Sequence, residues 1–276
     1  MISKNISHVT DVVNTDYIMY CTPRVDILGV KINAQTMEEA IHTIGFWIKN
    51  RLSTYVCLNN VHTIIESYYN QDIRNIYNKA GMATCDGMPL VWLCRLAGYS
   101  RADRIYGPDL MLALCEISVK RGWKHYFYGT TPEILEKLQE KLSCRFPGLC
   151  IVGSQAPPFR TLTTQEDQAI INQINATQSD IVWVGLGAPK QDIWMASHLG
   201  QISAPIMIGV GAAFDFLSGT KPQAPRLLQR SGLEWLFRLM MEPKRLCRRY
   251  LVYNTIFLWL IALKYITKRL SVFNRN

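Results

Sequence analysis

Apolar residues gather in short runs along this chain, and longer stretches with helical spacing of apolar positions separate those runs. Short runs bounded by turn residues are typical of buried strands. They lie at residues 54–58, 82–85, 124–128, 149–153, 180–186 and 205–210. A further apolar stretch at residues 25–32 is divided by Gly29 and predicts a pair of short strands.

The stretches between the runs predict helices. Thr36 and Glu39 form a capping-box pattern that opens a helix ending near residue 50. One helical stretch after the run at residues 54–58 continues through Ala80. Further helices are predicted at residues 89–97, 108–121, 132–145, 164–176 and 188–198. Strands that alternate with helices predict an α/β fold, in which a doubly wound parallel sheet carries helices on both faces.

The pattern changes near the C-terminus, where everything from Pro225 onward predicts helix with an interruption at Pro243. The charge changes at the same place. Residues 221–276 contain twelve Lys or Arg and two acids, a net charge of +10, whereas the preceding residues carry −1. We therefore divide the chain into an N-terminal extension (1–24), an α/β core (25–220) and a basic helical appendage (221–276).

Composition narrows the class of protein. A chain of 276 residues that is 49% hydrophobic and 18% charged can bury a sizeable core, which excludes disordered and collagen-like proteins. Residues 1–20 lack a cationic start followed by an apolar run, so we expect no signal peptide. The eight cysteines, without any Cys-x-x-Cys pattern, then predict reduced thiols buried in the core of a cytoplasmic protein.

One segment of the appendage is apolar enough to meet a membrane. Residues 251–263 span about 20 Å as a helix at ~1.5 Å per residue, against the ~30 Å of a hydrocarbon core. Asn254 lies within this segment and Lys264 ends it. We therefore expect it to lie in a membrane interface or against the protein body rather than to span a bilayer.

Small residues follow three of the predicted strands, at the place where an open α/β sheet binds its ligands. They include Gly129, then Gly185 and Gly187, then Gly209 and Gly211. Glycine permits close backbone approach, and the start of a following helix offers free N–H groups to a phosphate. A tight strand-to-helix turn would explain any one of them, whereas three on successive strands favour a nucleotide or diphosphate ligand.

Several polar side chains near these turns are candidates for chemistry. Asp86 follows a strand, so it could deprotonate an attacking hydroxyl or simply cap a helix. Lys190 and Gln191 begin a helix, where they could bind phosphate and a base or sugar edge, or form an exposed polar helix start. Arg101 and Arg104 could clamp a phosphate or remain solvated charges.

Absent motifs exclude other chemistry. The sequence has no Asp-x-Asp pair, no zinc spacing and no His-Glu-x-x-His, which argues against a metal site. It also lacks the G-x-G-x-x-G of a nucleotide-binding oxidoreductase, which stays an alternative function.

The basic appendage mixes arginines with Leu, Trp and Phe. Arg226, Arg230 and Arg238 are spaced by four and eight residues, which predicts one helical face. This composition favours an interfacial helix on an anionic membrane surface. A nucleic-acid-binding protein that uses this tail is the alternative, and some of these arginines could instead fold back onto a substrate diphosphate.

Six motifs follow one another along residues 25–250. They are Asp86-Gly87, Arg104-Ile-Tyr-Gly-Pro-Asp109, Val184-Gly-Leu-Gly-Ala-Pro-Lys-Gln191, Gly209-Val-Gly-Ala-Ala-Phe-Asp215, Gly232-Leu-Glu-Trp-Leu-Phe-Arg238 and Glu242-Pro-Lys-Arg-Leu246. In this order they resemble the WecG/TagA/CpsF family, glycosyltransferase family 26. The resemblance implies a Rossmann-like core and an appendage that meets the membrane and completes the active site.

The resemblance also implies the reaction. It is an inverting, metal-independent transfer from a UDP-sugar to a polyprenyl-diphosphate-linked sugar, without a cofactor, in bacterial surface polysaccharide biosynthesis. The sugar would be N-acetylmannosamine, its uronic acid or glucose. The protein would be cytoplasmic and peripheral on the inner face of the cell membrane, with no nucleic acid as partner and with homo-oligomerisation left open.

By the same similarity, Asp86 is predicted to be the catalytic base. Predicted substrate-binding residues are Asn59, Arg104, Asp109, Gly129, Gly185, Gly187, Lys190, Gln191, Gly211 and Asp215. Residues predicted to bind the lipid diphosphate and the membrane are Arg226, Arg230, Arg238, Arg245, Arg248 and Arg249. One departure is Cys57, where the family often has Thr; a thiol is the weaker hydrogen-bonding group, which puts in doubt whether this position touches the sugar.

Overall fold

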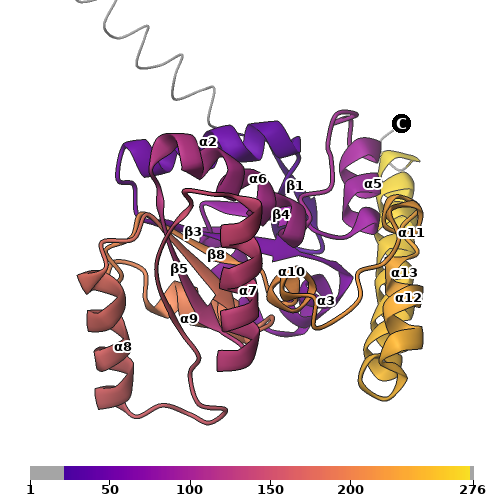
Figure 1. Ribbon diagram of the computed structural model, residues 1–276. Coiled ribbons are helices and arrows are strands. Elements are labelled where there is room, and N and C mark those ends of the chain that lie inside the picture. The colour runs from indigo at the N-terminus through magenta and orange to yellow at the C-terminus, as the bar shows by residue number, and fades with distance from the viewer. Residues whose placement is uncertain (1–21, 274–276) are drawn as a thin grey trace, which may run out of the picture.

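The computed structural model describes residues 22–273; the side chains of Arg249 and of residues 267–273, and nearly all of the predicted N-terminal extension, lie outside this description. Eight strands form one sheet in the order β1-β2-β4-β3-β8-β7-β5-β6 (Figure 1). The strands are β1 Arg24–Ile27, β2 Val30–Asn33, β3 Thr54–Asn59, β4 Met82–Cys85, β5 Lys124–Gly129, β6 Cys150–Gln155, β7 Ile181–Gly185 and β8 Ile206–Gly209.

The sheet is parallel from β2 to β6, and β1 pairs with β2 in the antiparallel direction. Leu28 and Gly29 join β1 to β2, with φ of 53° and 92°. Two positive φ values in a two-residue connection are typical of a hairpin turn, which returns the chain antiparallel. The predicted α/β sheet is therefore confirmed, with one antiparallel strand at its edge.

Helices cover both faces of the sheet (Figure 1). They are α2 Met37–Lys49, α3 Val61–Tyr69, α4 Gln71–Lys79, α5 Met88–Leu96, α6 Gly107–Arg121, α7 Pro132–Arg145, α8 Thr164–Ala176, α9 Lys190–Ser197, α10 Ala213–Ser218, α11 Arg226–Arg230, α12 Glu234–Met241 and α13 Pro243–Phe273. Helices α2, α6, α7 and α10 bury one apolar cluster, and α3, α4, α5, α8 and α9 bury the other. Trp183 and Val184, neighbours on β7, belong to opposite clusters because side chains alternate along a strand.

Capping side chains set several helix boundaries. The predicted capping box is present, since Thr36 Oγ1 accepts from the Glu39 N–H at 3.2 Å and the Glu39 carboxylate accepts from the Thr36 N–H at 2.8 Å. The single helical stretch predicted up to residue 80 is wrong. Asn70 ends α3, and its side chain accepts from the N–H groups of Asp72 and Ile73 to begin α4.

The appendage is helical as predicted, but it bends twice. Gly232 has a φ of 77°, a conformation that favours glycine, and it separates α11 from α12. The prediction that Arg226, Arg230 and Arg238 share one helical face is therefore wrong, because the first two lie in α11 and the third in α12. The expected interruption at Pro243 is where α13 begins.

Helix α13 is longer than the apolar run that the sequence suggested. Within the described residues, Pro243–Ile266 is the one stretch long and apolar enough to cross a membrane, by length and composition. One side of α13 packs on α3 and α12 and buries Leu246, Phe257 and Leu260. The other side is exposed.

The described cysteines are free thiols. Burial in the core is confirmed for four of them: Cys57, Cys85, Cys94 and Cys115. It is wrong for Cys144 and Cys247, which are exposed, and for Cys150, which is half-buried, while Cys21 lies outside the described residues.

Candidate active site

The carboxyl ends of five neighbouring parallel strands, β4, β3, β8, β7 and β5, lie along one edge of the sheet. Asp86 follows β4, and its backbone N–H donates to the carbonyl of Asn59 on β3 at 2.8 Å. Gly209 on β8 is in register with Cys57 on one side and Val184 on the other. The fold therefore brings Asp86 and the glycine turns to the edge where open α/β sheets bind ligands.

Asp86 is half-buried at the start of α5. The helix is capped by Gly87 without a side-chain hydrogen bond, so Asp86 does not play the capping role that its position also allowed. Burial raises the pKa of the Asp86 carboxyl, although Arg104, Arg238 and a hydrogen bond from Asn60 act to lower it. A carboxylate with a raised pKa is a better proton acceptor, as a general base requires.

Arg104 links the Asp86 loop to the appendage. Its Nε donates to the carbonyl oxygen of Asp86, and one terminal nitrogen donates to the Glu234 carboxylate at 2.6 Å. The other terminal nitrogen donates to the Gln229 carbonyl at 3.5 Å, and the guanidinium carbon lies 4.0 Å from the Tyr106 ring centroid. Arg104 is thus held by protein groups on several sides, which excludes the alternative of a freely solvated charge.

Arg238 is the appendage arginine that the structure brings to Asp86. It is half-buried on α12, and its positive charge lowers the pKa of the Asp86 carboxyl. Its guanidinium carbon lies 5.5 Å from the centroid of the Phe216 ring on α10. The site therefore contains a cation from each part of the chain, Arg104 from the core and Arg238 from the appendage.

Two acids that were predicted to bind substrate, Asp109 and Asp215, form ion pairs with the appendage. Asp109, in the first turn of α6, pairs with Arg226 at 2.7 Å, and Asp215 on α10 pairs with Lys221 at 3.2 Å. Both pairs join the core to the appendage. The other predicted arginines differ in their surroundings: Arg245 pairs with Glu242 at 2.5 Å, Arg230 and Arg248 are exposed, and the side chain of Arg249 lies outside the described residues.

The Gln191 side chain contacts the glycine residues at the ends of β7 and β8. Its side chain is 3% exposed, and its Oε1 accepts from the Gly187 N–H at 3.1 Å. Its Nε2 would lie 2.9 Å from a Cβ added to Gly209. Lys190 is exposed at the helix start and its phosphate contact stays a prediction, whereas the exposed helix start is wrong for Gln191, which is buried. Because Gln191 already binds the Gly187 N–H, that group is not free for a diphosphate in this structure.

The predicted glycines fall into two groups. A Cβ on Gly129 would lie 2.6 Å from the Gly185 carbonyl, and a Cβ on Gly185 would overlap the Phe214 ring. Tight packing therefore requires glycine at both positions, and their predicted contact with substrate stays a prediction. Gly187 has no atom within 4 Å of an added Cβ, and the nearest to Gly211 is at 3.5 Å. These two turns leave room for a ligand.

Sequence reasoning missed two side chains that complete this site. Glu234 on α12 is 8% exposed, and the buried Tyr106 hydroxyl donates to its carboxylate at 3.3 Å. Both residues lie inside the motifs that carry the resemblance. The signal for Glu234 was a lone carboxylate amid apolar neighbours in a segment that is otherwise strongly basic.

A model of the family described as "Glycosyl transferase WecG/TagA/CpsF family" matches residues 25–271. This chain belongs to that family. The resemblance carried by the sequence motifs is confirmed, and the protein is a glycosyltransferase.

Relatives of this glycosyltransferase occur in Staphylococcus aureus. Proteins from strains MW2, NCTC 8325 and MRSA252 carry the name N-acetylglucosaminyldiphosphoundecaprenol N-acetyl-beta-D-mannosaminyltransferase. They are 28%, 27% and 27% identical to this chain over 229 residues, which cover 82% of the chain and 88% of each relative.

In this family member, a buried polar cluster lies behind the strand ends. The Asp192 carboxylate accepts from the Tyr77 hydroxyl at 3.2 Å and hydrogen-bonds the Cys57 thiol. Burial raises the pKa of the Asp192 carboxyl to about 7. Cys57 is 1% exposed and Asn59 is fully buried, with its amide donating to Thr63 at 3.3 Å. The structure therefore does not bring either side chain to the surface of the site.

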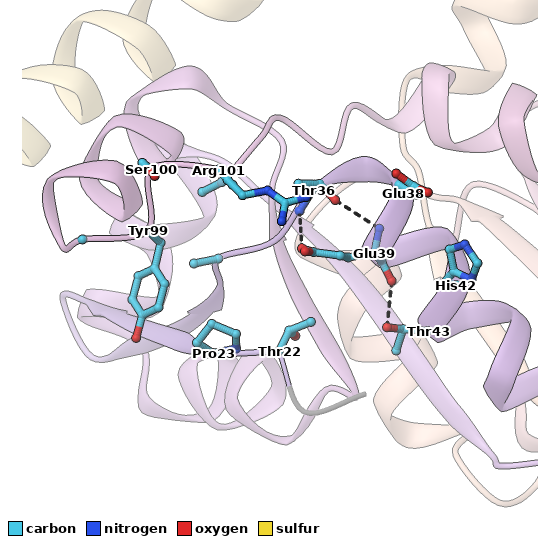
Figure 2. Close-up of a pocket in the computed structure, with 13 residues that line it drawn as sticks. Thr22, Pro23, Thr36, Glu38, Glu39, His42, Thr43, Tyr99, Ser100 and Arg101 are labelled. Atoms are coloured by element: carbon cyan, nitrogen blue, oxygen red, sulfur yellow. Dashed lines mark hydrogen bonds between the residues drawn. The ribbon is translucent and has the colours of Figure 1, made fainter. Parts of the chain in front are cut away.

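A cavity of about 720 Å³ lies elsewhere on the glycosyltransferase, around the start of α2 (Figure 2). Thr36, Glu39, His42 and Arg101 are among its lining residues. Thr36 and Glu39 use their polar groups in the capping box, as the dashed lines in Figure 2 show. Arg101 is the one candidate residue that lines this cavity, whereas Asp86, Arg104 and the glycine turns lie elsewhere, so we place the candidate site at the strand ends.

Proposed function

We propose that this protein transfers a sugar, with inversion and without a metal, from a UDP-sugar to a polyprenyl-diphosphate-linked sugar, and that Asp86 is the general base. The observation that supports this most is the half-buried Asp86 carboxylate with its raised pKa, at the strand ends and beside Arg104 and Arg238. Displacement of an anionic leaving group by a hydroxyl needs a base and positive charge within one site.

The proposed reaction is a direct displacement. The acceptor hydroxyl gives its proton to the Asp86 carboxylate while its oxygen bonds to the anomeric carbon of the donor. The bond from that carbon to the UDP oxygen breaks on the opposite face, and its electron pair leaves with UDP. Attack and departure on opposite faces invert the anomeric configuration. Arg238 and the open turn at Gly211 are our candidates to stabilise the charge on the departing diphosphate.

The names of the relatives suggest the substrates to try first. The Staphylococcus aureus proteins are named for N-acetylmannosamine transfer to N-acetylglucosaminyldiphosphoundecaprenol. We propose the same acceptor class for this chain and UDP-N-acetylmannosamine as the first donor. The uronic acid of that sugar and glucose are the other two donors, in the biosynthesis of a bacterial surface polysaccharide.

We further propose that the appendage holds the protein on the inner face of the cell membrane. Between residues 251 and 266 most exposed residues of α13 are apolar, and they recur at helical spacing. They are Leu251, Val252, Leu258, Trp259, Leu263 and Ile266, each between 38% and 67% exposed. An exposed apolar stripe of this kind is typical of an interfacial helix. Because the opposite side packs on the body, we propose that α13 lies in the interface rather than crosses the bilayer.

The nucleic-acid alternative is less well supported by the charge distribution. Four cations of the appendage pair with acids of the protein and are not displayed as a free basic patch: Lys221, Arg226, Arg245 and Lys264. Phosphate backbones are bound by clustered, accessible Lys and Arg side chains.

A donor screen tests the proposed function. The full chain is incubated with a short-chain polyprenyl-diphosphate N-acetylglucosamine and, separately, with the UDP derivatives of the three candidate sugars. We expect one donor to give a disaccharide lipid of the expected mass and inverted anomeric configuration by nuclear magnetic resonance. Activity should persist in EDTA. Failure of all three donors would contradict the proposed reaction, and loss of activity in EDTA with recovery on adding magnesium would contradict its metal independence.

A further inference from the structure

Glu234 is a buried carboxylate for which the proposed displacement has no use. It lies on α12, in the appendage, and is 8% exposed. Both of its oxygens are engaged, one by Arg104 at 2.6 Å and the other by Tyr106 at 3.3 Å. A buried charge is costly unless it is paired, so the position of Glu234 is tied to that of Arg104.

Arg104 interacts electrostatically with two carboxylates, those of Glu234 and Asp86. Its Nε already donates to the backbone carbonyl of Asp86, and its charge acts on the Asp86 carboxyl. A guanidinium placed this close to a carboxylate readily forms a two-pronged ion pair with it. Here the terminal nitrogen is directed to Glu234 instead, and the guanidinium stacks on the Tyr106 ring. In this structure the ion pair of Arg104 is therefore with Glu234.

We propose that Glu234 is a positioning residue, which holds the Arg104 guanidinium away from the Asp86 carboxylate and so keeps Asp86 available as a proton acceptor. The inference rests on the proposed function in one respect, namely that Asp86 is the base. It adds a role for the appendage inside the reaction itself: a carboxylate from α12 sets the proton affinity of a carboxylate on the core.

The charges around Asp86 support this role. The groups that face it are Arg104 and Tyr106 from the core, Glu234 and Arg238 from α12, Cys85 on its own strand, and the Asn60 amide. The negative charge of Glu234 raises the pKa of Asp86, and the two arginines lower it. Removing the Glu234 charge should therefore lower the pKa of the Asp86 carboxyl in two ways. It deletes a repulsive charge and releases Arg104 to pair with Asp86.

The Glu234→Gln variant of the full chain tests the inference through the pH dependence of kcat/KM. Deprotonated Asp86 is the active form, so activity falls as the pH drops through its pKa. We expect the acidic limb to move to lower pH by on the order of one unit, as for a carboxyl that gains a cationic partner. The plateau kcat should fall as well, because the base is weaker. Glu242→Gln, which removes another paired appendage carboxylate, should leave the limb in place.

A second measurement does not depend on activity. The Asp86 carboxyl is titrated by carbon-13 nuclear magnetic resonance, with its signal assigned from the Asp86→Asn variant. We expect Glu234→Gln to lower the Asp86 titration midpoint and Glu234→Asp, which keeps the charge, to return it most of the way. An unchanged midpoint in folded Glu234→Gln would overturn the inference, as would equal shifts in both variants. If no donor is used at all, the proposed function fails, whereas the titration still decides the role of Glu234.

Discussion

At the scale of a single residue, the surroundings of Asp86 shift the pKa of its carboxyl in opposite directions. Burial and Glu234 raise the pKa of its carboxyl, while Arg104, Arg238 and Asn60 lower it, and burial has the largest effect. Arg238, our candidate to stabilise the departing diphosphate, therefore also weakens the proposed base. Burial at the strand end offsets that loss, as the proposed role of Asp86 as a base beside two arginines requires.

The first prediction concerns Asp86→Asn. Asparagine keeps the size of the side chain but cannot accept the proton, so we expect kcat to fall by ~10²-fold or more, the usual contribution of a general base. The circular dichroism spectrum and the thermal midpoint should stay close to those of the parent protein. Full activity in the folded variant would show that Asp86 is not the base.

The second prediction concerns Asp192 and stability. The pKa of its carboxyl is raised to about 7 in the folded protein, chiefly by burial, and is about 3.9 when unfolded. Between these values the folded state holds a proton that the unfolded state has released. Stability from this group is therefore present below pH ~4 and is lost as the pH rises through 7.

The measurement compares Asp192→Asn with the parent protein by urea unfolding from pH 4 to pH 8. The variant has no titrating group at this position. As the pH rises across this range, the unfolding free energy of the parent should therefore fall relative to that of the variant by on the order of a few kcal/mol, at about 1.4 kcal/mol per pH unit. Parallel pH profiles for the two proteins would contradict the assignment.

At the scale of elements, the central strands β3, β4, β5, β7 and β8 were predictable because most positions in them are buried. A continuous apolar run bounded by turn residues has few other structures open to it. The break between α3 and α4 was hidden, because Asn70 fits a helical pattern and only its hydrogen bonds to Asp72 and Ile73 show it to be a cap. A polar residue that caps one helix and ends another leaves little trace in hydrophobic periodicity.

The candidate site was predictable only where it depends on strand ends. Asp86 and the glycine turns follow from the topology of the sheet. The burial of Gln191 does not, because a polar side chain at a helix start is normally solvated, and its partner is a backbone N–H four residues earlier. The contact of Glu234 with Arg104 joins residues 130 positions apart, a distance over which local pattern carries no information.

The third prediction concerns the exposed face of α13. Replacing Leu258, Trp259 and Leu263 with serine removes three exposed apolar side chains that are not among the buried core residues, so the fold should persist. Each contributes ~1.5–3 kcal/mol when buried. We therefore expect binding to vesicles containing phosphatidylglycerol to fall by at least ~100-fold in a flotation assay.

A matched control is Phe159→Ser. It removes an aromatic side chain that is 88% exposed on the surface of the α/β part of the chain, far from α13 in sequence, and should leave vesicle binding unchanged. Unchanged flotation of the triple variant would contradict the membrane role of this stripe. Resistance of the bound parent protein to extraction at high pH and high salt would contradict the interfacial placement and favour a spanning helix.

At the scale of the whole molecule, the appendage is joined to the core by contacts of two kinds. Ion pairs lie along its length, from Asp215–Lys221 and Asp109–Arg226 to Asp26–Lys264. Such exposed pairs contribute little each, about 0–1 kcal/mol. The pair of Arg104 with Glu234 is largely buried and lies beside Asp86. The boundary at residue 221 stays a prediction. The ion pairs show that residues on either side of it lie next to one another at the candidate site.

The order of these parts along the chain has a consequence for biosynthesis. Every strand and Asp86 are made before residue 210, whereas Glu234 and Arg238 emerge from the ribosome much later and are followed by the apolar stripe of α13. A chain released early would carry the entire sheet and the proposed base but neither appendage group that faces it. Under the proposed roles of Asp86 and α13, chemical competence and membrane attachment are acquired together in the last stage of translation, so we expect a chain that stops before residue 234 to be inactive.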